Sequence, residues 1–87
     1  LLKISGEILA GDSKNTFDNS TSKQIVDDIT SVKKSGINLA VVVGGGNIIR
    51  GVNHKDFSLA KTSADHMGML STIINGVYLK NLLYFLN

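Results

Sequence analysis

The sequence has 87 residues, of which 43% are hydrophobic and 18% charged, and its formal net charge is +2. This composition indicates a globular chain of at most one domain and excludes intrinsic disorder. Cysteine is absent, which excludes disulfides and thiolate metal sites. The basic residues are scattered, with Lys33–Lys34 as the one adjacent pair, so we expect no nucleic-acid partner. No apolar run approaches the ~20 residues of a membrane span and no signal-peptide pattern opens the chain, so we expect a cytoplasmic protein without a membrane partner.

The first half of the chain predicts a strand, a loop and a helix. Leu1 to Ser5 has the character of a short buried strand that ends at Gly6, and residues 7–20 are polar and turn-rich, as in a loop. Thr21–Gln24 has the Thr-x-x-Gln form of a capping box, which marks the start of a helix. Apolar residues then recur at helical spacing: Ile25, Val26, Ile29 and Val32. Gly36 is well placed to end this helix.

The second half predicts a strand and a helix joined by a polar loop. Residues 37–43 form a nearly continuous apolar, β-branched run, as expected for a strand buried on both faces of a parallel sheet. Gly44–Asn47 ends it abruptly, and roughly residues 51–62 form the loop. From about Ala64 we predict a helix whose apolar side carries four residues: Met67, Leu70, Ile74 and Val77.

Alternating strands and helices predict an α/β domain, in which ligands bind beyond the carboxyl ends of parallel strands. Both predicted strands end in glycine turns, at Gly6 and at Gly44–Gly46, which would meet at one edge of the sheet. Successive N–H groups in such turns form a concave anion site. Lys3 adds a positive charge there, and Arg50 adds a forked donor suited to phosphate oxygens. The Walker pattern is absent, so the residues alone predict an anionic or phosphorylated ligand bound without a P-loop.

Three segments occur in order at spacings that resemble a known family. They are Leu2–Glu7, Val43–Gly51, and Asp65–Leu70 followed by Asn75–Gly76. Together they resemble the first third of the bacterial-type uridylate (UMP) kinases of the amino-acid-kinase superfamily. Ala64 departs from the family pattern, which has glycine before the aspartate, and Lys61–Ser63 differs from the usual lead-in.

The resemblance implies a three-layer αβα fold with a mainly parallel sheet. Residues 1–87 would then be the N-terminal part of a single amino-acid-kinase domain, so the fold is incomplete in this chain. The implied activity is phosphoryl transfer from ATP to UMP, giving UDP, in pyrimidine nucleotide biosynthesis. The implied assembly is a cytoplasmic homohexamer.

The resemblance also implies roles for individual residues. It implies contacts to ATP from five of them: Lys3, Ser5, Gly6, Gly46 and Arg50. Gly45 and Asp65 would contact UMP. Lys3 and Arg50 would in addition be catalytic, because they neutralise charge on the transferred group. The sequence has no cluster with metal-ligand spacing, so Mg²⁺ is expected to arrive with ATP.

Two alternatives stay open. The chain could belong to an amino-acid or carbamate kinase of the same fold, against which Asp65–Leu70 argues. It could also be a non-catalytic remnant or oligomerisation module, since it starts in an apolar strand and ends on the apolar segment Leu82–Asn87. We expect that the native chain continues and that these 87 residues alone are inactive.

Overall fold

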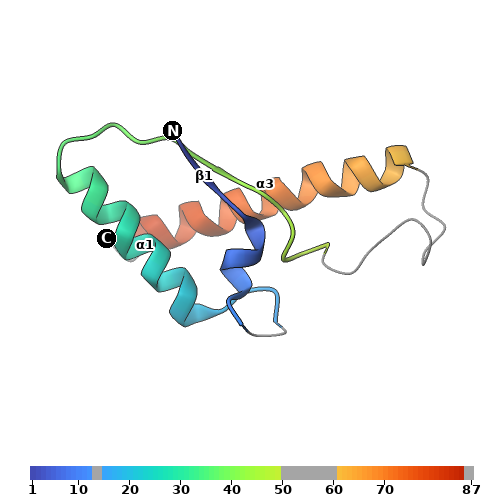
Figure 1. Ribbon diagram of the computed structural model, residues 1–87, viewed down its shortest axis with the longest axis horizontal. Helices are drawn as coiled ribbons and strands as arrows, with labels where there is room; N and C mark the ends of the chain where they lie inside the picture. Colours follow the sequence, from blue (N-terminus) through green and yellow to red (C-terminus); the bar gives the residue numbers. More distant parts are fainter. Residues whose placement is uncertain (13–14, 50–60, 86–87) are drawn as a thin grey trace.

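The computed structural model describes residues 1–12, 15–49 and 61–85 (Figure 1). The elements in chain order are the strand β1 (Leu2–Ile4), the 3₁₀ helix η1 (Gly6–Ala10), the helix α1 (Asn19–Lys34), the strand β2 (Val41–Val43) and the helix α3 (Lys61–Phe85). The two strands pair in parallel, with Leu2 opposite Val41 and Ile4 opposite Val43. The described chain is therefore an α/β unit of two parallel strands and two helices, which confirms the predicted class in its simplest form.

Helix α1 begins earlier than the capping box predicts. Its N-cap is Asp18, whose carboxylate accepts hydrogen bonds from the Thr21 backbone N–H at 2.9 Å and from the Thr21 hydroxyl at 2.7 Å. Both bonds lower the pKa of Asp18 because they favour its ionised form, and the bond from the Thr21 hydroxyl has the larger effect. Thr21 thus donates to the cap and is not the cap itself. At the other end α1 stops at Lys34, and Gly36 adopts a φ of 93°, as predicted for a glycine that ends a helix.

The predicted loop over residues 7–20 is wrong in its first part, where the chain forms η1. The Ile8 N–H donates to the Ser5 carbonyl at 3.2 Å and closes the first turn. This turn inserts Leu9 and Ala10 into the interior, where both are fully buried. Leu9 then packs in one core cluster with residues from both strands, both long helices and the segment before α1: Val43, Leu79, Ile4, Phe17, Ile25 and Tyr78. Burial of two apolar side chains explains why this short polar-flanked segment is ordered.

Within the part of the chain that the structure describes, only one face of the sheet is covered. Ile4 and Val43 face the helices and join the core, whereas Lys3 and Val42, which are opposite each other in register, are exposed. Val42 is 50% exposed, so the prediction of a strand buried on both faces does not hold within the described residues. The alternation of strand side chains puts Lys3 on the uncovered face.

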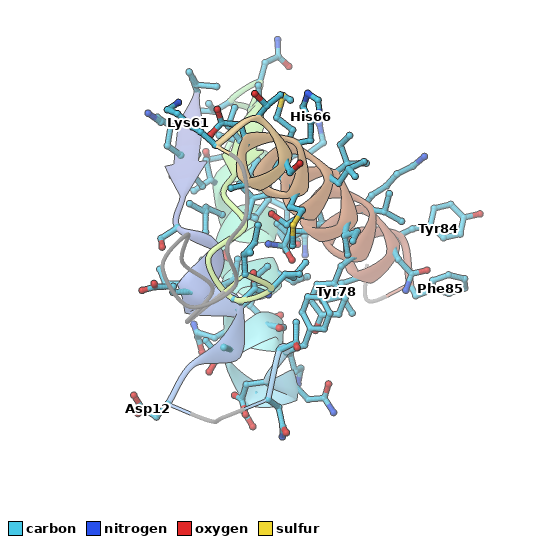
Figure 2. All side chains as sticks on the ribbon, turned by 90° about the vertical axis from the view of Figure 1, so that its right-hand side faces the viewer. Asp12, Lys61, His66, Tyr78, Tyr84 and Phe85 are labelled. Atoms are coloured by element: carbon cyan, nitrogen blue, oxygen red, sulfur yellow. The ribbon has the colours of Figure 1, made fainter. Side chains whose placement is uncertain are left out.

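Helix α3 begins at Lys61, three residues before the predicted start, and buries a different side from the predicted one. The four residues of the predicted apolar side, Met67, Leu70, Ile74 and Val77, are between 40% and 62% exposed. The buried positions are instead Ser71, Asn75 and Leu79. Figure 1 shows that the C-terminal part of α3 lies beside α1, whereas its N-terminal turns extend away from the rest of the molecule. At the C-terminal end, Tyr84 and Phe85 project outward (Figure 2). Neither helix of the described segments combines the length and the hydropathy needed to cross a bilayer.

Candidate nucleotide site

The two glycine turns are in direct backbone contact, as the sequence predicts. The Gly44 N–H donates to the Ile4 carbonyl at 3.0 Å, which extends the parallel ladder beyond β1 and β2. A Cβ atom placed on Gly6 would lie 2.6 Å from the Gly44 oxygen and 2.8 Å from the Gly46 nitrogen. Only glycine permits this approach, because backbone atoms cannot move aside as a flexible side chain can.

Helix α3 closes the second turn from behind. A Cβ atom on Gly45 would overlap the Ser71 hydroxyl and lie 2.8 Å from the Ser71 Cβ. The Ser71 hydroxyl donates to the Gly68 carbonyl within the helix at 2.7 Å, so its polar atom is satisfied while its small volume admits the turn. A large apolar residue at position 71 would push the helix off the glycines. The buried side of α3 is small and polar for this reason.

Two asparagine amides join the turn to the helix. Asn75, which is fully buried, donates from Nδ2 to the Gly44 carbonyl at 2.6 Å and to Asn47 Oδ1 at 2.7 Å. Asn47, also buried, donates from Nδ2 to Asn75 Oδ1 at 3.2 Å and to the Thr16 carbonyl at 2.9 Å. Every buried side-chain nitrogen and oxygen in the described residues has a hydrogen-bond partner. A satisfied network of this kind fixes the geometry of the groups it holds.

The turn presents backbone donors that no described residue uses. The Gly45 carbonyl accepts from the N–H groups of Ile48 and Ile49, at 3.0 and 3.2 Å. The N–H groups of Gly45 and Gly46 donate to no other residue within ranges 1–12, 15–49 and 61–85. Such successive amides are suited to bind an anion. The side chain of Glu7 lies close to Gly46, because a Cβ atom on Gly46 would be 2.9 Å from Glu7 Cγ. The negative charge of this carboxylate would repel a bound anion, so binding of an anion here needs a cation nearby.

Lys3 and Ser5 lie on the β1 side of the same edge. Lys3 is exposed on the uncovered face of the sheet, and the Ser5 carbonyl accepts the first hydrogen bond of η1. The Ser5 side chain is exposed and makes no cap hydrogen bond, so its hydroxyl is available. Both residues are thus accessible for the contacts that the sequence predicts. Those contacts remain predictions.

The structure does not bring all the predicted site residues together. Arg50 lies outside the described residues, and so does most of the predicted loop over residues 51–62. Asp65 lies in the first turns of α3, is exposed, and pairs with Lys61 at 3.1 Å. In the view of Figure 2, Lys61 and His66 lie at the opposite end from Asp12. The helix contacts the glycine turns through Ser71, about 9 Å further along its axis than Asp65.

The sequence profile of the amino acid kinase family matches residues 1–87, which is the whole chain.

The chain belongs to the amino acid kinase family.

Within this family the similar proteins are uridylate kinases, in agreement with the resemblance seen in the sequence. The chain is 47% identical to the uridylate kinase of Rickettsia bellii over 87 residues, which are 100% of this chain and 36% of the relative. It is 48% identical to the uridylate kinase of Campylobacter curvus over 84 residues, covering 95% of this chain and 35% of the relative. The chain therefore spans about a third of the length of the curated relatives that it matches.

Solved structures agree on the fold. The UMP kinase of Bacillus anthracis superposes with a TM-score of 0.89 at 36% identity, covering 95% of this chain and 34% of that chain. The UMP kinase of Ureaplasma parvum superposes with a TM-score of 0.87 at 37% identity, covering 99% of this chain and 36% of that chain. The arrangement of strands, turns and helices in this family member is thus that of part of a UMP kinase.

Sequence reasoning gave no role to three residues that build the site. Asn47 and Asn75 lie within the family-like segments, and Ser71 lies in the predicted helix, but the sequence pattern assigns none of them a function. The spacing of Ser71 and Asn75 is the sequence signal that could have identified them. With Leu79 they recur every four residues and form one side of α3. Two small or polar residues on that side, in a helix rich in apolar residues, indicate close approach to a backbone.

Proposed function

We propose that residues 1–87 are the N-terminal part of a single amino-acid-kinase domain that transfers a phosphoryl group from Mg²⁺-ATP to UMP, giving UDP. The observation that carries the proposal is the direct contact of two glycine turns at the carboxyl ends of parallel strands, with the N–H groups of Gly45 and Gly46 unused by described residues. Membership of the family and likeness to uridylate kinases supply the reaction.

Phosphoryl transfer demands positioning of the reacting groups and neutralisation of their charge. In this proposal Gly6, Gly46 and Ser5 face the phosphates of ATP, and Gly45 faces UMP. Lys3 and Arg50 are the catalytic cations, and Lys3 also offsets the carboxylate of Glu7 near Gly46. Asp65 contacts UMP from the first turns of α3, where its ion pair with Lys61 is exposed and costs little to break.

Mg²⁺ in this proposal enters with ATP, where it neutralises phosphate charge. The described segments contain no group of three or more histidine, aspartate or glutamate side chains that could hold a metal ion. The carboxylate side chain that lies against Gly46 is that of Glu7.

The remaining features of the proposal follow from the family. The complete domain would have three layers, with a mainly parallel sheet that includes β1 and β2 between two helical layers. The assembly would be a homohexamer in the cytoplasm, acting in pyrimidine nucleotide biosynthesis. The 87 residues alone would not turn over UMP, since they span about a third of the relatives' length.

The test is an acceptor panel on the full-length native protein with Mg²⁺-ATP, following release of ADP. UMP, CMP, aspartate, glutamate and carbamate are offered separately. ADP formed with UMP and not with the others supports the proposal. Turnover of an amino acid or carbamate would keep the fold and reject the substrate, and silence with all five in a folded protein would favour a non-catalytic module.

The panel is sharpened by a pair of lysine variants. Lys3→Ala is expected to lower kcat/KM for UMP about 100-fold, because it removes a cation that stabilises negative charge on the transferred phosphoryl group. Lys23→Ala removes an exposed lysine of α1 and serves as the matched control. Equal activity of the two variants would contradict the role of Lys3.

A further inference from the structure

Asn75 is the residue through which α3 controls the glycine turn. It is fully buried, it lies in the middle of α3, and its side chain reaches the backbone of the turn that follows β2. We infer that Asn75 is a positioning residue: by holding the Gly44 carbonyl it fixes the direction of the Gly45 N–H, and so the affinity of the turn for the anionic group of UMP. This inference deepens the proposed function and rests on it for the identity of the ligand.

The geometry of one peptide unit links Asn75 to the ligand side. The Gly44 carbonyl and the Gly45 N–H belong to the same planar unit, and no peptide bond in the described chain is cis. In a trans unit the two groups point in opposite directions. Because the Gly44 oxygen points to Asn75 Nδ2 at 2.6 Å, the Gly45 N–H points away from α3. It has no acceptor among the described residues, and in this proposal it donates to the bound anion.

Glycines need such a restraint more than other residues do. Gly44 and Gly45 lack side chains that would limit rotation of the peptide unit between them, so the free backbone could turn the N–H elsewhere. The Ser71 hydroxyl and the Gly6 backbone exclude bulk on either side of the turn, but neither binds the Gly44 oxygen. The hydrogen bond from Asn75 is the directional contact that selects one orientation.

Asn47 fixes which way the Asn75 amide faces. Asn47 Nδ2 donates to Asn75 Oδ1 at 3.2 Å, and Asn75 Nδ2 donates back to Asn47 Oδ1 at 2.7 Å. Turning either amide over would bring two donors or two acceptors face to face. The second donation of Asn47, to the Thr16 carbonyl at 2.9 Å, anchors the pair to the segment before α1. Asn75 is therefore held with its donor toward Gly44.

Asn75 also stabilises the turn, because an apolar side chain of similar volume would leave the Gly44 carbonyl and Asn47 Oδ1 without their donor. Measuring ligand affinity in a folded variant separates this structural contribution from the positioning role.

The experiment compares Asn75→Asp with Tyr78→Phe in the full-length protein. The ionised aspartate keeps the shape of Asn75 and can still accept from Asn47, but in this form it cannot donate to the Gly44 carbonyl. Tyr78→Phe removes another part-buried hydrogen bond of α3, from the Tyr78 hydroxyl to Ser22 at 2.9 Å, without touching the turn. Binding of UMP and of a non-hydrolysable ATP analogue is measured by calorimetry well below the thermal midpoint of each variant, and kcat and KM are measured in parallel.

The expected result is a loss of UMP affinity of at least about tenfold in Asn75→Asp, with a smaller loss for the ATP analogue. Tyr78→Phe is expected to lower the thermal midpoint while UMP binds as before. Unchanged UMP affinity in a folded Asn75→Asp protein would overturn the inference, as would equal losses in both variants. Asn75→Ser, which is neutral and too short to reach Gly44, replaces the aspartate variant if that one does not fold. If neither folds, Asn75 serves stability alone and the inference falls.

The two proposals fail in different ways. If the unmodified protein binds UMP but transfers no phosphate, the proposed function is wrong, and Asn75 is still judged by the binding data. If the unmodified protein binds neither nucleotide, the turn is not the anion site and both proposals fall.

Discussion

The two long helices of this chain bury opposite kinds of surface. Helix α1 follows the amphipathic rule, with Val26 fully buried, Ile29 nearly so, and charged residues outside. Helix α3 turns Ser71 and Asn75 inward and leaves Ile74 and Val77 exposed. The two helices pack against each other and α1 also packs against η1, whereas α3 in addition packs against the glycine turn that follows β2. In a helix that packs against a binding turn, the turn determines which residues are buried more than the apolar core does.

The largest effect should come from the turn itself. Gly6→Ala puts a Cβ atom 2.6 Å from the Gly44 oxygen, against backbone that cannot yield, and should cost about 3 kcal/mol, near the upper end for overpacking. Gly45→Ala meets mainly the Ser71 side chain. Adding Ser71→Gly should therefore restore part of the stability lost in Gly45→Ala and none of that lost in Gly6→Ala. Urea unfolding measures the stability of Gly6→Ala and Gly45→Ala, each with and without Ser71→Gly. If Ser71→Gly restored stability equally in both, the turns would be less tightly packed than the structure indicates.

The contrast between helix faces gives the next prediction. Val26→Ala removes two methyl groups from a fully buried position of α1 and should lower the free energy of unfolding of the 87-residue chain by about 1.5–2.5 kcal/mol. Ile74→Ala, on the exposed side of α3, should change it by less than about 0.5 kcal/mol. Urea unfolding again decides. Equal losses in this chain would break the comparison, whereas equal losses only in the full-length protein would show that another segment or subunit covers the outer side of α3.

An exposed glycine of α3 should be replaceable with a gain in stability. A Cβ atom on Gly76 would meet nothing within 4 Å, and the residue lies inside a helix. Gly76→Ala should therefore stabilise the chain by about 0.5–1 kcal/mol through helix propensity. Gly36→Ala is the control: it too has open space, but its φ of 93° disfavours alanine, so it should destabilise. A loss of stability in Gly76→Ala would mean that the space next to Gly76 is filled in solution.

The smallest effect concerns the cap of α1. The hydrogen bonds from Thr21 lower the pKa of Asp18 in the folded chain below its unfolded value of 3.8. A depressed carboxyl pKa contributes stability that is present above the unfolded pKa and is lost as the pH falls through the folded pKa. Thermal midpoints measured from pH 6 down to about pH 2 should therefore show a smaller acid-induced loss for Asp18→Asn than for the unmodified chain. Thr21→Val keeps the backbone donor and removes the hydroxyl, so it should lie between the two. Identical pH profiles for all three would show that Asp18 does not cap α1 in solution.

The sequence predicted the order of the elements, the parallel pairing and the meeting of Gly6 with Gly44–Gly46. These follow from local rules: apolar β-branched runs make strands, and glycines permit two backbones to touch. It mispredicted the cap of α1 because Asp18 and Thr21 both have capping chemistry, and only the fold of η1 decides between them.

The buried side of α3 could not be read from apolar spacing for a different reason. Periodicity finds the side with more apolar residues, but burial in this helix is set by the closeness of Gly45, which selects Ser71 and Asn75 for small size and for hydrogen bonding. The predicted apolar side of α3 is largely exposed within the described segments, so apolar spacing did not mark the buried side.

Asn75 is followed by Gly76, the pair of residues in which asparagine loses its amide most readily when the chain is free to bend. That reaction requires the glycine nitrogen to attack the asparagine side chain, which the helical backbone and the buried amide network of α3 prevent. Each local opening of the helix would lift this protection. One direct product is aspartate at position 75, the substitution that we expect to loosen the glycine turn. The helix thus also protects the site against chemical ageing, and the slow appearance of that aspartate in stored protein would record how often α3 opens.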